Sequence, residues 1–180
     1  MVLVPAEPIF FDENGKIEQV EATSCGLNGG PLEGKGSYPA YIACNLFYAK
    51  NIPQEKRLAC MTQDIPDVED IINWQHSHKD DEPVQYLHAV SDGMTAGYKY
   101  FQIKEEVKTL AFIIRGKASG RLEIALSEEA QSIGEAFLTC NYEEWHEIFV
   151  SVNIPKGKQA LFFRYYGEGS FDIQQFSFIN

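Results

Sequence analysis

The sequence predicts an all-β protein, an antiparallel β-sandwich of jelly-roll type with one long loop. Apolar and polar residues alternate with period two through much of the chain, and residues typical of turns separate the alternating segments. Aromatic residues make up 13% of the 180 residues and are mostly Phe and Tyr, which favour strands. A chain of this length suffices for one well-buried domain, so we expect a single core.

The clearest alternation lies in residues 120–126 and 146–154, each of which predicts a half-buried strand. The centre of residues 107–116 is apolar on both parities, as in a strand that is covered on both faces. The apolar positions expected to face the core in the first two segments are Leu122, Ile124, Leu126, Ile148, Val150, Val152 and Ile154. Further strands are expected at residues 16–22, 38–47, 84–90, 98–103, 159–166 and 173–178.

Turn-forming residues divide these strands, and two segments fall outside the pattern. The expected turns lie at residues 91–93, 115–120, 155–158 and 167–170. Residues 49–83 show no sustained alternation, so within a domain spanning 16–180 they are expected to form a long inserted loop. Residues 1–15, which contain two prolines, are expected to form a linker or a strap between modules.

The charge of the chain excludes some partners. Fifteen basic and 26 acidic residues give a formal net charge of -11, which repels phosphate backbones and anionic lipids, so we expect no nucleic-acid and no membrane partner. No apolar run approaches the roughly 20 residues of a membrane span, and the first residues lack the pattern of a signal peptide. A neutral or cationic ligand is the better expectation.

The segment HSHKDDE, residues 76–82, is the part of the sequence that most resembles a catalytic site. His76, His78 and Glu82 fit H-x-H-x-x-x-E, the first half of the metal motif of cupins, which would make the chain a cupin-like metal enzyme. The second half would place a third histidine at position 162, where the sequence has Phe162. A hydrated loop is therefore the preferred interpretation, and the metal enzyme is the least favoured of three hypotheses.

The four cysteines do not form a metal or redox motif. Cys25, Cys44, Cys60 and Cys140 are far apart and contain no C-x-x-C pair. We expect free, buried thiols, with a single disulfide as the alternative. No hydrolase, P-loop or dinucleotide motif is present in the sequence either, so the chain is interpreted as a binding protein.

Three stretches in order resemble a known family: KIEQVEATSCGLNG, then YLHAVSDGMTAGYKYF, then NYEEWHEIFVSVNIPKGKQALFFRYYGEG followed by FDIQQFSF. They resemble successive strands and loops of a family 6 carbohydrate-binding module. Residues 21–46 resemble, more narrowly, the module that follows the catalytic propeller in some family 43 glycoside hydrolases, the arabinofuranosidase and xylosidase group. The resemblance implies a galactose-binding-like jelly roll whose loops bind sugars.

The resemblance also implies sugar-binding residues. In the family a surface aromatic three residues before a buried tryptophan stacks on a pyranose ring, and Tyr142 stands three before Trp145, which is expected in the core. A second aromatic would be Tyr38, with Tyr41 as the alternative. The family's closing asparagine falls on Asp172, whose carboxylate can accept hydrogen bonds from sugar hydroxyls. Trp74, in the inserted loop, is the remaining candidate and could instead pack on a neighbouring module.

The family's structural calcium site is the only cofactor that the resemblance implies. It uses two polar side chains two residues apart on the first strand, which Gln19 and Glu21 match, and an acid from the last strand, where this chain has Gln174. Residues two apart on a strand share a face, as joint coordination requires. Calcium at Gln19 and Glu21 is therefore an expectation weakened by the missing charge.

Together these observations predict a non-catalytic module of a glycoside hydrolase. It would bind oligo- or polysaccharides of the xylan or arabinose type by aromatic stacking, beside a catalytic glycosidase module in the same polypeptide. The alternative is a structural module that buttresses the catalytic domain without sugar affinity. Titration with oligosaccharides distinguishes the two.

Overall fold

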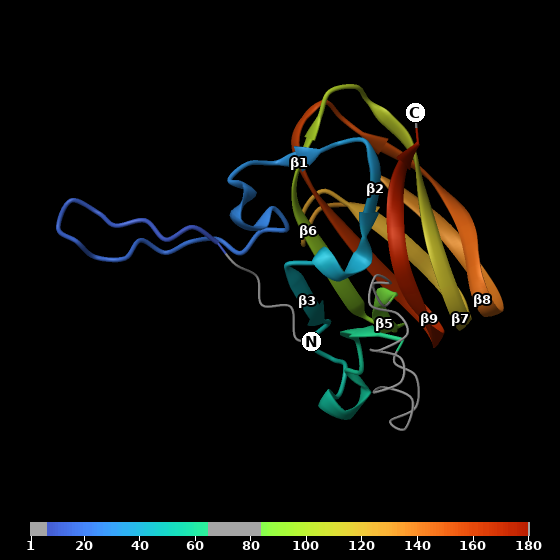
Figure 1. The fold of residues 1–180 in the computed structure, drawn as a ribbon. Coiled ribbons are helices and arrows are strands. Elements are labelled where there is room, and N and C mark those ends of the chain that lie inside the picture. Colours follow the sequence, from blue (N-terminus) through green and yellow to red (C-terminus); the bar gives the residue numbers. More distant parts are fainter. Residues whose placement is uncertain (1–6, 65–83, 180) are drawn as a thin grey trace, which may run out of the picture.

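The computed structural model describes residues 7–64 and 84–179, and in these ranges the chain is almost entirely β-structure (Figure 1). The described strands are β1 Leu32–Glu33, β2 Gly36–Pro39, β3 Asn45–Tyr48, β4 Cys60–Gln63, β5 Gln85–Ser91, β6 Met94–Ile103, β7 Val107–Ala125, β8 Gly134–Ile154 and β9 Gly157–Ile179. Three short 3₁₀ helices, η1 Gly26–Asn28, η2 Ala40–Ile42 and η3 Gln54–Lys56, lie between the early strands. None of the helices in the described ranges is long and apolar enough to cross a membrane.

The three long strands β7, β8 and β9 form the frame of the molecule (Figure 1). β7 lies between β8 and β9 and pairs antiparallel with both. The first half of β9 pairs with β6 on its other side, whereas its second half pairs with β2 and β5. β1 pairs parallel with β6, and the other strand pairs among the described residues are antiparallel. The predicted all-β class is confirmed.

Glycines let the long strands bend where the sequence predicted turns. The turns expected at residues 115–120 and 167–170 do not form, because β7 and β9 run through both segments. Gly116 has a φ of 129°, and a Cβ there would lie 2.7 Å from the Cα of Phe171 on β9. Glycine is thus used for a positive φ and a close strand approach rather than for a chain reversal. The predicted turns at 91–93 and 155–158 are confirmed, since they join β5 to β6 and β8 to β9.

The core is a cluster of aromatic and branched side chains between the strands. Phe112 and Phe163 pack with their ring centres 4.9 Å apart, and Phe163 and Phe176 with theirs 5.0 Å apart. The hydroxyl of the fully buried Tyr98 donates a hydrogen bond of 2.9 Å to the carbonyl oxygen of Ala40, which satisfies both groups. Of the predicted core positions, the fully or nearly fully buried ones are Leu122, Ile124, Val150, Val152 and Ile154.

The N-terminal part of the described chain departs from the predicted strand pattern. Residues 16–22 form no strand, and the only pairing there is the isolated bridge between Phe11 and Ile17. Residues 7–23 instead form a narrow hairpin that extends away from the sandwich (Figure 1), which we call the N-terminal arm. The predicted loop 49–83 contains η3 and β4 in its described part, while His76, His78 and Glu82 lie outside the described residues.

All four cysteines lie in the described ranges and are free thiols. Cys25 and Cys140 are buried, as expected, Cys44 is half-buried and Cys60 is exposed at the start of β4. The alternative prediction of a disulfide is therefore wrong. The prediction of buried thiols is confirmed for Cys25 and Cys140 only.

Candidate functional site

Arg115 on β7 lies between two aromatic rings on the side of the strands that faces away from the main core. Its guanidinium carbon is 4.6 Å from the ring centre of Tyr86 on β5 and 4.3 Å from that of Trp145 on β8. The two rings also meet edge to face, with their centres 5.4 Å apart. Stacking of a guanidinium on aromatic faces is favourable and restricts all three side chains to one arrangement.

Two carboxylates accept hydrogen bonds from the guanidinium of Arg115. Its Nε donates to Oδ2 of Asp172 at 3.1 Å, and its two terminal nitrogens donate to the two oxygens of Asp64 at 2.8 and 3.2 Å. The second oxygen of Asp172 is 2.8 Å from Nδ1 of His88. We call the residues of this network the Arg115 cluster: Asp64, Tyr86, His88, Arg115, Trp145 and Asp172.

Asp172 also holds an irregularity of the β5 backbone in place. The pairing of β5 with β9 contains a bulge between Leu87 and Val90, in which Ala89 has a φ of 55°. The amide of Ala89 donates a hydrogen bond of 3.0 Å to Oδ1 of Asp172. Because a non-glycine residue with positive φ is strained, this bond contributes to keeping the bulge. The bulge presents His88, which is half-exposed, to solvent.

The hydrogen bonds within the cluster favour the charged forms of Asp64 and Arg115. Arg115 holds the pKa of Asp64 below its usual value, mainly through the hydrogen bonds between them. The hydrogen bonds to the same carboxylate, and those to Asp172, raise the pKa of Arg115 against the opposing effect of desolvation. Burial raises the pKa of Tyr86. A general acid needs a carboxyl group whose pKa is raised, so Asp64 is unsuited to that role.

The segment of β8 that contributes Trp145 to the cluster also carries two further rings, Tyr142 and His146. Tyr142 and His146 stack on each other, with ring centres 4.3 Å apart and an angle of 31° between the planes. Trp145 is half-exposed and outside the core clusters, so the expectation that it is a core residue is wrong; Arg115 and Tyr86 occupy only part of its surface. Tyr142 is also half-exposed and contacts the edge of the main core.

The other predicted sugar-binding residues lie apart from this surface or outside the described ranges. Tyr38 on β2 packs edge to face on Phe101 at 5.1 Å, and its hydroxyl donates to the carbonyl oxygen of Glu33 at 2.5 Å. It is therefore placed among core aromatics, not beside Tyr142. The alternative, Tyr41, lies in η2 and is half-exposed. Trp74 lies outside the described residues.

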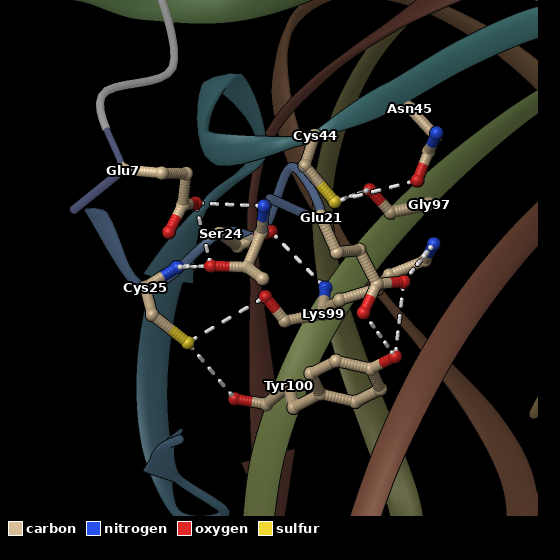
Figure 2. Close-up of polar contacts among 10 residues, drawn as sticks. Glu7, Glu21, Ser24, Cys25, Cys44, Asn45, Gly97, Lys99 and Tyr100 are labelled. Atoms are coloured by element: carbon tan, nitrogen blue, oxygen red, sulfur yellow. Dashed lines mark hydrogen bonds and ion pairs between the residues drawn. The ribbon is translucent and has the colours of Figure 1, made fainter. Parts of the chain in front are cut away.

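Gln19 and Glu21 are both in the N-terminal arm, on no strand. The carboxylate of Glu21 accepts hydrogen bonds from Nζ of Lys99 at 2.9 Å and from the hydroxyl of Tyr100 at 2.9 and 3.1 Å (Figure 2). These contacts hold the pKa of Glu21 below its usual value. A lysine in this position competes with any cation, and the described residues contain no group of three or more His, Cys, Asp or Glu placed to bind a metal. As placed here, Gln19 and Glu21 do not fit a calcium site, and calcium binding by them stays a sequence-based prediction.

Four residues of the Arg115 cluster were not predicted from the sequence: Asp64, Tyr86, His88 and Arg115. One signal for Arg115 was present, because a charged residue that ends the apolar run AFII in a central strand needs partners. No comparable signal marks Tyr86 or Asp64, since their proximity arises from pairing between strands that are distant in sequence.

Comparisons with known proteins agree with this architecture. No protein-family model matches the sequence. A family 6 carbohydrate-binding module from Bacillus halodurans that binds β-1,3-glucan has a TM-score of 0.64 and 11% identity, over 84% of this chain and 100% of that one. By fold, the chain is thus a β-sandwich of the jelly-roll class. More narrowly, the fold is that of the family 6 carbohydrate-binding modules that the sequence resembles.

Two longer proteins contain a region similar to almost the whole chain. A family 43 arabinoxylan arabinofuranohydrolase from Bacillus subtilis matches over 96% of this chain and 33% of its own length, with a TM-score of 0.63 and 13% identity. A xylosidase/arabinosidase from Thermoclostridium stercorarium is 36% identical over 172 residues, which are 95% of this chain and 35% of that protein. The chain therefore spans about one third of the length of each of these two enzymes.

Proposed function

We propose that this chain is a non-catalytic carbohydrate-binding module of a larger glycosidase and that it binds sugar at the β8 rings. The observation that carries the proposal is the half-exposed pair Tyr142 and Trp145 three residues apart on β8, with Arg115 packed against Trp145. The similarity to family 6 modules in fold, and to part of two glycosidases, supports the same conclusion.

The rings suit a sugar because the CH face of a pyranose is apolar and packs on an aromatic face. Trp145 is kept in place from behind by Arg115, so little conformational entropy is lost when a ligand binds. Hydroxyls of the sugar would find donors and acceptors nearby in His88, Glu143 and Glu144, all of which are exposed. Asp172 is only 13% exposed and serves mainly to position His88 and Arg115.

The proposed ligand class is xylan or another arabinose-bearing plant polysaccharide. The relatives named above are a xylosidase/arabinosidase and an arabinoxylan arabinofuranohydrolase, and this chain matches about one third of each. A module that is tethered to a catalytic domain raises the local concentration of substrate, so a dissociation constant of about 1 mM is already useful. The net charge of -11 is compatible with these uncharged polymers.

Isothermal titration of the purified chain with xylo-, arabino- and cello-oligosaccharides tests the proposal. We expect saturable heat with at least one of them, and no release of reducing sugar during long incubation. Titrations without heat for all three classes would refute sugar binding and leave the structural module that only supports a catalytic domain. Hydrolysis that is abolished by a substitution in this chain would refute the non-catalytic assignment.

A further inference from the structure

We infer that the N-terminal arm is a docking element that packs on the catalytic part of the same polypeptide. This inference rests on the proposed function, because it takes the longer glycosidase as given. Five of the thirteen large apolar side chains that are exposed in the described residues lie within residues 9–20 of the arm. They are Ile9, Phe10, Phe11, Ile17 and Val20, with exposed fractions of 62, 55, 64, 67 and 37%. Such a concentration in one short element is typical of an interaction surface.

The turn of the arm is ordered by its own hydrogen bonds. Oδ1 of Asp12 accepts from the amides of Asn14 and Lys16 at 2.8 and 2.9 Å, and Gly15 adopts the positive φ of 75° that the turn requires. The arm nevertheless has only two segments, and no third strand covers either of its faces among the described residues (Figure 1). A two-stranded hairpin of this kind is marginally stable in water, so a partner surface is needed to hold it.

The base of the arm, in contrast, is fastened to the sandwich (Figure 2). Oε1 of Glu7 accepts hydrogen bonds from the amide and hydroxyl of Thr23 at 2.8 and 2.7 Å, which closes the two ends of the arm on each other. Glu21 is bound to Lys99 and Tyr100 of β6, as described above. A fixed base sets the direction in which the apolar tip projects, so less entropy is lost when the tip docks.

Beside the base lies a hollow of about 330 Å³, which continues the apolar surface of the arm onto the sandwich. Its lining includes Phe10 and Val20 from the arm, Pro31, and Tyr100 and Lys158 from the sandwich. A partner that covers the arm can therefore also contact the body of the module. The lining also includes the charged side chains of Glu7 and Glu21, and a mixture of apolar and polar groups is the usual composition of an interface.

The comparisons indicate which partner covers the arm. The match to the isolated family 6 module leaves out 16% of the 180 residues, about 29 residues. The match to the family 43 enzyme leaves out only 4%, about seven residues, so it must include most of residues 7–23. The 36% identical relative is also aligned over 172 residues and so includes at least half of the arm. The arm therefore has a counterpart in proteins in which the remaining two thirds of the chain are available to bury it.

Hydrogen exchange of the complete polypeptide and of the 180-residue chain alone tests the inference. We expect amides of residues 9–20 to exchange at least about tenfold more slowly in the complete polypeptide, since burial at an interface protects them. Phe10→Ser should abolish most of this protection. Phe137→Ser is the matched control, because Phe137 on β8 is 79% exposed and distant in the fold from the arm, and it should leave the protection unchanged.

Two results would overturn the inference. One is equal exchange of residues 9–20 in both samples. The other is protection of residues 9–20 in the 180-residue chain alone that increases with protein concentration, together with a dimer in sedimentation velocity. That result would mean that the arm packs on a second copy of the chain. Oligosaccharide titration of the same samples separates the two proposals. If the samples bind no oligosaccharide but the arm amides are protected, only the proposed sugar binding is contradicted. If the samples bind oligosaccharide but the arm amides are not protected, only the docking role is contradicted.

Discussion

Arg115 on β7 and Asp172 on β9 are direct partners in the strand register, and their side chains form an ion pair with Nε and Oδ2 3.1 Å apart. Both side chains are largely buried, with exposed fractions of 23 and 13%. The pair, on β7 and β9, joins the ring of Trp145 on β8 to the bulge of β5, and so connects four strands. The pair therefore restricts the position of the Trp145 ring, which packs on Arg115.

Replacing Arg115 by methionine should destabilise the protein more than the loss of a surface charge. Asp172 would be left nearly buried without its cation, and breaking such a pair costs about 3 kcal/mol. Urea unfolding of Arg115→Met measures the cost. Lys117→Met, two residues further along β7 at an exposed position, is the control and should change the free energy of unfolding by less than about 0.5 kcal/mol. Equal effects of the two substitutions would show that the Arg115 network is unimportant for stability.

Acid should weaken the Arg115 network in a predictable pH range. The pKa of Asp64 is lowered in the folded protein, so its stabilising contribution is present above the unfolded value of about 3.9 and is lost as the pH falls through the folded pKa. Because Asp64 is 47% exposed, solvent screening limits the effect to about 1 kcal/mol or less. Thermal melts of Asp64→Asn between pH 7 and pH 3 should show a shallower loss of stability than wild type.

Glu129→Gln is the control for the acid series, since Glu129 is exposed and forms no ion pair within the described ranges. It should follow the wild-type pH dependence. If Asp64→Asn and wild type lose stability in parallel below pH 5, the pairing of Asp64 with Arg115 is not coupled to folding.

Gly116→Ala should be strongly destabilising. The new Cβ would meet the Cα of Phe171 at 2.7 Å and the carbonyl oxygen of Ser170 at 2.8 Å, and alanine does not tolerate a φ of 129°. We expect a loss of more than about 2 kcal/mol in urea unfolding. Gly30→Ala has no atom within 4 Å of the new Cβ and should be nearly neutral. A neutral Gly116→Ala would mean that β7 does not bend at this residue.

Thiol labelling provides an independent test of the fold. Cys60 is exposed and should react first with a thiol reagent in the native protein. Burial raises the pKa of Cys140, which lowers its thiolate fraction further, so Cys140 should react only on unfolding. Mass spectrometry of time-resolved labelling measures both rates. Rapid labelling of Cys140 in the native protein would show that this side chain of β8 is not buried.

The strands were largely predictable from the sequence because their alternation reports burial directly. Val150, Val152 and Ile154 are buried as the period-two pattern indicated. The turns at 115–120 and 167–170 were wrongly predicted because glycine is common both in turns and at strand bends, and local sequence does not separate the two uses. The prediction of a strand at 16–22 was wrong. Apolar residues such as Ile17 and Val20 are separated there by polar and charged residues, and this pattern suits an exposed arm equally well.

The candidate site was only partly predictable. Tyr142 and Asp172 were singled out through the family resemblance, whereas Trp145 was expected in the core. Arg115 and Tyr86 could not, since β7 and β5 approach the same surface only through their separate pairing with β9. The burial of Tyr38 beside Phe101 depends on the register of β2 against β9, which no pattern within residues 36–39 specifies.

Sugar binding by the β8 rings is measured by titrating Tyr142→Ala and the wild type with the best-bound xylo- or arabino-oligosaccharide. The control is Tyr166→Ala on β9, at a tyrosine that is 39% exposed and packs near Arg121 instead. We expect at least tenfold weaker binding for Tyr142→Ala, about 1.4 kcal/mol, and unchanged binding for the control, with both variants folded at the temperature of the titration. Wild-type affinity in folded Tyr142→Ala would show that Tyr142 does not bind the sugar.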